Sequence, residues 1–398
     1  MGCGLPMNFS RTDRSLVAEW WYTVDRPLIA AILALIAAGF LFSLAASPAV
    51  AVHHGLAPFY FVQRHAVFAA AVVPVLIAVS LLPAAQIRRF SLALFFAMLG
   101  LMAMVLYTGP EINGARRWVE IAGQQLQPSE LLKPAFVVLT AWLFAQTAVA
   151  PKMPALPLAI ALYLAAATAL VMQPDIGQTT LITAVWGALL FLSGQSLKRI
   201  GAFLAAGAIA FAVAYETLPH VRSRVDRYMH TGAGDTFQMD RARASIIEGG
   251  LLGRGPGEGT LKMALPDAHT DYVLAVIAEE YGTLACLGLV GLFGFVVFRG
   301  LSASWREPDV FRRLAASGLG LLLGVQVLIN VGVAAGLLPS KGMTLPFVSY
   351  GGSSMLGMAI GMGMLLAVTR RRPGAAVLAA PRDERGLAFE PRENVELR

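Results

Sequence analysis

Ten long apolar runs, separated by short clusters of charge, constrain the fold of this chain more than any other feature. A helix needs about 20 mostly apolar residues to cross a bilayer. Of the 398 residues, 57% are hydrophobic and only 14% are charged, whereas a soluble domain carries about 25% charged residues. A soluble protein can bury one or two such helices, but ten in one chain predict membrane spans. The runs cover residues 27–52, 66–82, 90–107, 134–150, 155–172, 178–194, 200–215, 272–298, 314–338 and 355–369.

The uncharged runs predict helices rather than strands, because a backbone in lipid must satisfy its hydrogen bonds internally. The predicted fold class is an all-α integral membrane protein of ten transmembrane helices, with a large extracytoplasmic loop at 218–270 between spans seven and eight. Residues 1–26 are a polar N-terminal segment, so the first span is itself the expected targeting signal. The membrane domain is 27–370, and the tail 371–398 mixes both charge signs with Pro and Gly, which predicts disorder.

Basic residues in the short loops set the predicted orientation, because cytoplasmic loops are enriched in Lys and Arg. They fall on one side of the predicted spans, and an even number of spans puts both termini on that side. The loops there carry Arg88, Arg89, Lys152, Lys198, Arg199, Arg299, Arg306, Arg312, Arg313, Arg370, Arg371 and Arg372. Cys3 is near the terminus and Cys286 lies inside span eight, so no disulfide is expected.

The opposite side keeps basic residues that this charge rule leaves unexplained. Arg116 and Arg117 lie between spans three and four, and the loop 218–270 carries seven basic and six acidic residues. Either these bases pair with acids of the loop, or they bind an anionic ligand at the outer membrane surface. A diphosphate suits the second alternative, because the planar fork of an Arg side chain matches phosphate oxygens.

Polar residues at the start of span four form the next candidate site. The helix begins at Pro128 or at Pro134, and in either case Glu130 and Lys133 have the i, i+3 spacing that lets side chains meet. One alternative is an ion pair that closes a helix end, and the other is a pair that lines a polar cavity. Asp175, before span six, is expected to cap that helix.

The stretch 265–272 ends the large loop and opens span eight, so it places Asp271 where water meets the membrane. Glu279 and Glu280 follow at about 80° and 180° around the helix from Asp271. They cannot both face one cavity, so at least one is expected to pair inside the bundle. His269 is interpreted as a surface histidine in preference to a catalytic one. The glycine-rich stretch 249–259 lacks the βαβ context of a nucleotide site and is interpreted as a flexible outer loop with exposed amides.

The stretch 338–354 before span ten contains two prolines, and glycines and serines that predict irregular backbone. Such backbone is tolerated at membrane depth only where protein or water covers it. A helix N-terminus with free amides follows and is a ready anion site. This is the one glycine-broken segment that the sequence indicates, which argues against a transporter built from inverted repeats with paired broken helices.

Six strings, taken together and in order, resemble the SEDS family (shape, elongation, division and sporulation) over about residues 11–370. They are GARRW, QPSELLK, QPDIGQT, GGLLGRGPGEGT, LPDAHTDYVLAVIAEEYG and LPSKGMTLPFVSYGGSS. The last string and the loop at 222–250 are most similar to the division branch of the family. Tyr272 stands where Phe is usual, and residues 228–230 read Tyr-Met-His where the family often has Phe-Leu-Asp.

The resemblance implies a peptidoglycan glycosyltransferase that polymerises lipid II at the outer face of the cytoplasmic membrane. The acceptor GlcNAc 4-hydroxyl attacks the donor's anomeric carbon, and undecaprenyl diphosphate leaves. Carried over by motif, Asp271 is the catalytic carboxylate, most simply a general base. The residues expected to contact substrate are Arg116, Arg117, Glu130, Lys133, Gln238, Lys341, Ser349, Gly351, Gly352 and Ser353, with Asp175, His269 and Glu279 in support.

The resemblance also implies partners. They are lipid II, a monofunctional transpeptidase with one span (a class B penicillin-binding protein) and other membrane proteins of the division septum, with no nucleic acid. Basic side chains or a divalent cation, Mg²⁺ or Mn²⁺, would stabilise the leaving diphosphate, and no cofactor is assigned with certainty. Two rival classes are a lipid II flippase and a secondary transporter. A non-catalytic division scaffold is a third, but it would not need an acid at Asp271.

Overall fold

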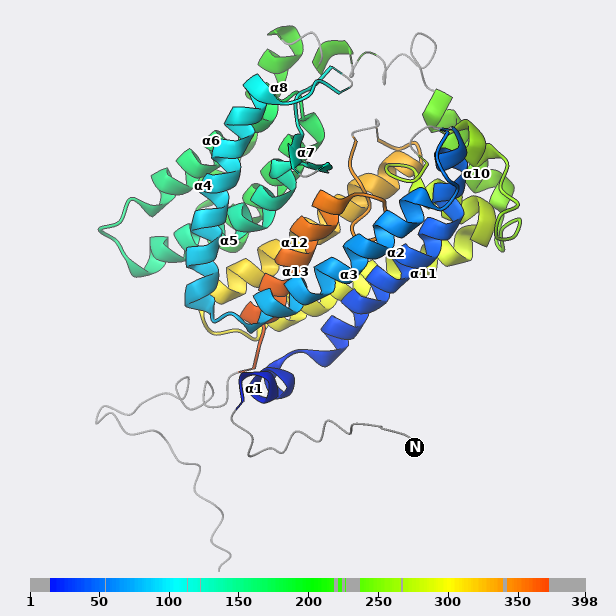
Figure 1. The fold of residues 1–398 in the computed structure, drawn as a ribbon. Coiled ribbons are helices and arrows are strands. Elements are labelled where there is room, and N and C mark those ends of the chain that lie inside the picture. Colours follow the sequence, from blue (N-terminus) through cyan, green and yellow to red (C-terminus); the bar gives the residue numbers. More distant parts are fainter. Residues whose placement is uncertain are drawn as a thin grey trace, which may run out of the picture.

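The computed structural model describes residues 15–53, 55–112, 114–121, 123–217, 221–223, 226, 237–265, 268–338 and 342–371. This part is mostly helical (Figure 1). Its helices are α1 (Leu16–Thr23), α2 (Arg26–His53), α3 (Tyr60–Leu81), α4 (Ala84–Thr108), α5 (Pro128–Val149), α6 (Ala155–Met172), α7 (Ile176–Leu192), α8 (Leu197–Thr217), α10 (Phe237–Gly249), η1 (Leu261–Ala264), α11 (Val273–Trp305), α12 (Val310–Ala334) and α13 (Gly352–Val368). A short antiparallel hairpin joins β1 (Val119–Ile121) to β2 (Gln124–Leu126).

Each predicted apolar run coincides with a helix, which confirms the all-α membrane class. Eight helices of the described chain are long and apolar enough to cross a membrane: α2, α3, α4, α5, α6, α8, α11 and α12. The helices α7 and α13 are equally apolar but have 17 residues each. The ambiguous start of span four is resolved at Pro128, the first residue of α5, where a missing N–H is harmless.

The helices α5, α12 and α13 form the centre of the bundle. Most residues of each are buried, and the other helices surround them (Figure 1). The helix α8 lies at the edge, and none of its residues is buried. Buried polar residues collect on the central helices, so the membrane frame encloses polar groups that lipid alone would not tolerate.

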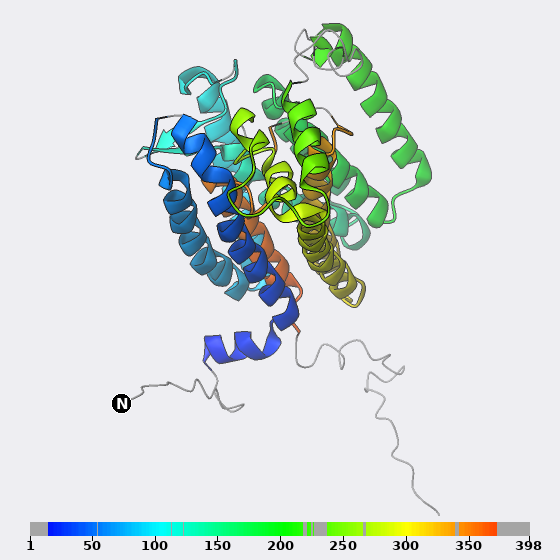
Figure 2. The same cartoon turned by 90° about the vertical axis from the view of Figure 1, so that its right-hand side faces the viewer.

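The helix α1 lies in the N-terminal segment, which was predicted only as polar. Ser15 caps it by accepting a hydrogen bond from the Ala18 amide at 3.2 Å. It lies crosswise at the end of the bundle opposite α10 (Figure 2). The Trp20 indole N–H donates to Ser80 at the end of α3, 2.8 Å away. The Arg371 amide donates to the Thr23 carbonyl at 3.0 Å, so the end of α13 meets α1.

The helix α11 is broken at Gly282, whose φ of 82° and ψ of 171° are not helical. The sequence indicated one glycine-broken segment, before α13, and the structure adds a second one inside α11. The backbone on both sides of this break forms hydrogen bonds with the glycine-rich stretch 249–259. The Arg254 and Gly255 amides donate to the Glu279 and Glu280 carbonyls. The stretch is a loop, as interpreted, but its Arg254 and Gly255 amides are bonded to α11 and are not free.

Candidate functional site

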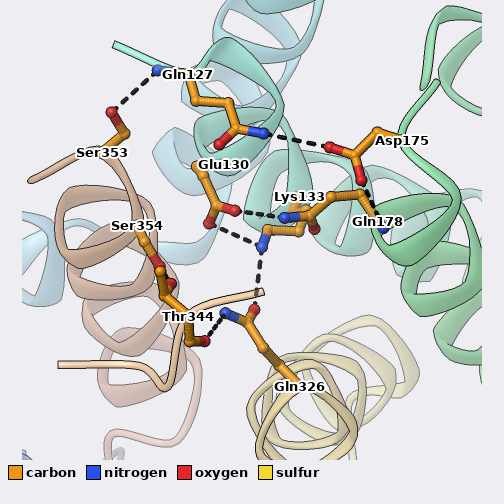
Figure 3. A network of polar contacts seen from close by, with 9 residues as sticks. All are labelled: Gln127, Glu130, Lys133, Asp175, Gln178, Gln326, Thr344, Ser353 and Ser354. Carbon is orange, nitrogen blue, oxygen red and sulfur yellow. Dashed lines mark hydrogen bonds and ion pairs between the residues drawn. The ribbon is translucent and has the colours of Figure 1, made fainter. Parts of the chain in front are cut away.

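A buried ion pair at the start of α5 is the centre of one polar network (Figure 3). The Lys133 ammonium lies 2.8 Å from Glu130 Oε2 and donates to Gln326 Oε1 of α12 at 3.0 Å. Only 2% of the Lys133 side chain and 6% of the Glu130 side chain are exposed. Buried charges persist when they are paired and hydrogen-bonded. The contact predicted from the i, i+3 spacing is thus confirmed.

The network continues from Glu130 toward α7. The Gln178 side-chain amide donates to Glu130 Oε1 at 2.5 Å, while the Gln178 backbone amide donates to Asp175 Oδ1 at 3.2 Å. Asp175 is therefore the N-cap of α7, as predicted. The Gln127 side chain donates to the second Asp175 oxygen at 3.3 Å, and the Gln127 backbone amide donates to Ser353 at 3.0 Å. The network thus joins the starts of α5, α7 and α13.

Arg117 holds the turn between α6 and α7. Its guanidinium donates to the Gln173 carbonyl at 2.9 Å and to the Pro174 carbonyl at 2.5 Å, and it lies 3.8 Å from Asp175. Burial raises the pKa of the Asp175 carboxyl, and the Arg117 charge and the Gln178 amide oppose this effect. The Arg117 guanidinium is thus bound to acceptors of the protein itself. Arg116 is exposed and lies 3.6 Å from Glu111, away from the network.

A second polar centre surrounds Asp271, which is half-buried just before α11. The Asn330 side-chain amide donates to the Asp271 carbonyl at 3.1 Å and to the Met343 carbonyl at 2.8 Å. One turn away on α12, Gln326 donates to the Thr344 carbonyl at 3.1 Å. The same Gln326 accepts from Lys133. One face of α12 therefore links the Lys133 network to the segment that carries Asp271.

The segment 342–351 also forms hydrogen bonds with the residues that directly precede Asp271. The Ser349 hydroxyl donates to the Thr270 carbonyl and accepts from the Leu345 amide at 2.8 Å. The Tyr350 amide donates to the His269 carbonyl at 2.8 Å. A Cβ placed on Gly342 would lie 3.8 Å from Asp271 Oδ2. The predicted irregular backbone before α13 thus forms one wall beside the carboxylate.

His269 is not the surface histidine that the sequence suggested. It is half-buried, and its ring centroid lies 4.8 Å from that of Phe61 and 5.5 Å from that of Tyr350. The sequence analysis missed this packing because Phe61 comes from α3, far away in the chain. The ring stack fixes the residues that lead into Asp271.

Arg64 is a site candidate that sequence reasoning missed. It lies in the second turn of α3, donates to the Tyr60 hydroxyl at 2.9 Å and also donates to Gln124 of β2. Burial raises the pKa of the nearby Tyr350 phenol, and the Arg64 charge partly opposes this effect. The available signal was a basic residue immediately before a predicted span at 66–82, on the side where basic residues are least expected.

The remaining predicted residues are dispersed. Gln238 lies in the first turn of α10, and Lys341 lies outside the described residues. Gly351 is the N-cap of α13, and Gly352 packs so closely on Phe68 that a Cβ would come within 2.7 Å of the ring. Glu279 accepts from the Leu261 and Lys262 amides of η1 and does not bond the segment 342–351. The described residues contain no group of three or more His, Cys, Asp or Glu side chains that could hold a metal ion.

The fold and the site define a multi-pass helical membrane protein with buried charges and a carboxylate near one end of its bundle. A sequence model of the FtsW/RodA/SpoVE family of cell cycle proteins matches residues 26–373. The chain belongs to this family, which confirms the membership that its motifs predicted.

Curated relatives of this chain carry one name. The probable peptidoglycan glycosyltransferase FtsW of Caulobacter vibrioides is 43% identical over 371 residues, which cover 92% of this chain and 94% of the relative. The protein of the same name from Halorhodospira halophila is 34% identical, with 87% and 90% covered. These identities place the chain on the FtsW side of the family.

Solved structures share the fold. A chain from work on the structural coordination of polymerization and crosslinking by a peptidoglycan synthase complex matches with a TM-score of 0.73 and 28% identity, over 88% of this chain and 98% of that chain. The rod shape determining protein RodA of Thermus thermophilus matches with a TM-score of 0.64 and 28% identity, over 88% and 97%. The helical arrangement is therefore that of RodA.

Proposed function

We propose that this protein polymerises lipid II into glycan strands at the outer face of the cytoplasmic membrane. The observation that carries the proposal is the joint placement of Asp271 and Lys133 by one face of α12. Asn330 holds the Asp271 carbonyl, and Gln326, one turn away, holds the Lys133 ammonium. A carboxylate and a buried cation that are linked through one face of a helix suit a reaction that removes a proton and expels an anion. The names of the relatives agree with this activity.

The reaction forms one bond and breaks one bond at the same carbon. The acceptor 4-hydroxyl oxygen attacks the anomeric carbon, the bond from that carbon to the diphosphate oxygen breaks, and Asp271 takes the hydroxyl proton. A positioned base contributes about 10²–10⁴-fold to such a step. The departing diphosphate carries the bonding electron pair, and a cation at this end stabilises it. The described candidates are Lys133 and Arg64. Attack opposite the leaving group would invert the sugar.

We further propose that all ten apolar helices cross the membrane, although α7 and α13 have only 17 residues each. In this arrangement both termini and α1 lie in the cytoplasm, and α10 and Asp271 lie outside. The Lys and Arg residues between the spans support this orientation. FtsW-like identity supports a location at the division septum. The match to a chain of a peptidoglycan synthase complex supports a class B transpeptidase as partner.

The general-base role of Asp271 predicts how two variants behave. Asp271→Asn keeps the size but cannot take a proton, so polymerisation should be abolished while folding and partner binding persist. Asp271→Glu moves the carboxylate by about 1 Å and should lose about 10²-fold, because misplacement on that scale has such an effect. The measurement is glycan-strand formation from lipid II by the purified protein with its transpeptidase partner.

Glu120→Gln, at an exposed position of β1, is the matched control and should polymerise like the wild type. Equal polymer from Asp271→Asn and wild type would remove Asp271 from the base role. Absence of polymer from the wild type, with its partner present, would favour the lipid II flippase, which needs the same charges but performs no chemistry.

A further inference from the structure

The break in α11 divides this span into a short and a long half. The short half, residues 273–281, begins two residues after Asp271 and ends at Gly282. Its nine residues form about 2.5 turns, roughly 13 Å long. All but the last of them are buried. This half-helix is therefore one of the elements that hold Asp271 in place, together with α12 and the segment 342–351.

The outer loop is inserted into the break by exchange of backbone hydrogen bonds. Two loop amides, of Arg254 and Gly255, donate to the Glu279 and Glu280 carbonyls at 2.9 and 3.0 Å. In the opposite direction, the amides of residues 283 and 284 donate to the carbonyls of residues 250 and 251 at 2.9 and 3.2 Å. The loop thus replaces part of the helical ladder that the break removes.

Glycines allow this close approach. A Cβ on Gly282 would lie 2.2 Å from the Leu251 carbonyl oxygen, and a Cβ on Gly253 would lie 2.2 Å from the Glu280 carbonyl oxygen. Both residues also have a positive φ, of 82° and 80°, which disfavours other residue types. The backbones of loop and span are therefore in direct contact, and movement of one is transmitted to the other.

Two neighbouring carboxylates of the short half bind the next part of the loop. Glu279 accepts from the Leu261 and Lys262 amides at 2.8 and 3.1 Å. Glu280 pairs with the Lys262 ammonium and accepts from the Gly257 amide at 3.0 Å. Lys262 also donates to the Ala45 carbonyl of α2 at 3.3 Å. The expectation that at least one of the two glutamates pairs inside the bundle is met by Glu280, while Glu279 is held by backbone amides.

The Lys262–Glu280 pair is almost completely buried, with 6% and 0% of the two side chains exposed. A buried ion pair is weak evidence for stability, because removing two charges from water offsets much of their attraction, and apolar replacements are often neutral. The best-attested use of such a pair is to select one arrangement. Here the pair connects η1, α2 and the short half of α11, so it selects the orientation of that half relative to its neighbours.

We propose that Lys262 and Glu280 are positioning residues that orient the half-helix 273–281 and thereby set the place of Asp271. A tilt of about 5° in an element roughly 13 Å long moves its end by about 1 Å. A displacement on that scale can lower a rate about 10²-fold. The pair touches neither substrate nor reacting atoms in this assignment. The proposal rests on the general-base role of Asp271 only for its effect on rate.

The kinetic test uses the double variant Lys262→Met/Glu280→Leu, which replaces the pair with apolar groups of similar size. In the complex with the transpeptidase, kcat for lipid II polymerisation should fall about 10²-fold. KM should stay within about twofold, and the melting temperature should be close to that of the wild type. The single variant Lys262→Arg keeps an ion pair with Glu280 and should retain most of the wild-type kcat. Glu248→Gln alters an exposed ion pair of the same loop and serves as the control.

A second readout is independent of activity. His269→Cys and Tyr350→Cys, in a background without Cys3 and Cys286, lie where a backbone hydrogen bond of 2.8 Å joins the two positions. Their disulfide should form rapidly with Lys262 and Glu280 intact, and more slowly in the apolar double variant. If Asp271→Asn polymerises normally, the base role fails, yet a slower disulfide still supports positioning.

Wild-type kcat together with wild-type disulfide formation in the double variant would overturn the proposal. If the double variant does not fold, Glu280→Gln is measured in the same two ways. It keeps the side-chain size and removes the charge, and unchanged kcat and disulfide rate in that variant would equally overturn the assignment.

Discussion

At the scale of single residues, the Glu130–Lys133 pair is the feature of the site whose disruption costs the most free energy of folding. Glu130→Ala leaves a buried ammonium without its counter-charge, which costs about 3–5 kcal/mol. The charge swap Glu130→Lys/Lys133→Glu keeps a pair, and the Gln178 and Gln326 amides can turn to present the opposite atom. Because Lys133 is a candidate to stabilise the leaving diphosphate, we expect either single alanine variant to lose polymerisation and the swap to fold but stay as inactive as the single variants.

The measurement is polymer yield at matched protein levels, with melting temperature as a check on folding. Thr147→Ala, near the far end of α5, provides a control on the same helix. A swap variant that recovers much of the polymerisation would show that the pair is structural and would remove Lys133 from the diphosphate.

Residue-level prediction succeeded where the interaction is local. The contact of Glu130 with Lys133 follows from their spacing, and the cap at Asp175 follows from its place before a helix. Partners far along the chain were not predictable, because nothing in the α5 sequence indicates that Gln326, 193 residues away, accepts from Lys133. His269 was misjudged for the same reason, since its ring partners come from α3 and from the segment before α13.

At the scale of elements, α12 carries a testable role. The Asn330 side-chain amide donates to the Asp271 carbonyl at 3.1 Å and to the Met343 carbonyl at 2.8 Å. Asn330→Ala removes both donors without adding charge, so the segment beside Asp271 loses its attachment to α12. Polymerisation should fall about 10²-fold, in line with a displacement of about 1 Å.

Glycan-strand formation by Asn330→Ala is compared with that by Leu328→Ala. Leu328 lies on the same helix and is 69% exposed, so it is a control for changes in α12 that do not reach the site. Wild-type activity in Asn330→Ala would mean that Ser349 and the ring stack suffice to hold the residues around Asp271.

The sequence predicted where helices occur better than where they are interrupted. All ten apolar runs became helices because hydrophobic length alone is sufficient to specify a span. The break at Gly282 escaped notice because glycine is common in transmembrane helices. The helix is interrupted at this glycine because the fold brings the carbonyls of residues 250 and 251 against α11, where they accept hydrogen bonds from the amides that follow Gly282.

At the scale of the whole molecule, orientation is the property that the proposed function requires. Single cysteines at Arg199 and Glu258, both exposed, should react with a membrane-impermeant maleimide from opposite sides in a background without Cys3 and Cys286. Arg199→Cys should label only after the cytoplasmic side is opened, and Glu258→Cys should label in intact cells. Labelling of both from the cytoplasmic side would place Asp271 on the wrong face for lipid II polymerisation.

The meeting of α1 with the end of α13 has a consequence for the connectivity of the bundle. The Thr23 carbonyl and the Arg371 amide are 3.0 Å apart, and Arg370 also contacts Thr23. The short helix that precedes α2 and the residues that follow α13 therefore meet at one end of the bundle. A circular permutant that joins residues 15 and 371 by a linker and opens at the turn 150–154 should for this reason keep each helix in its direction, because the chain enters and leaves the bundle at neighbouring points.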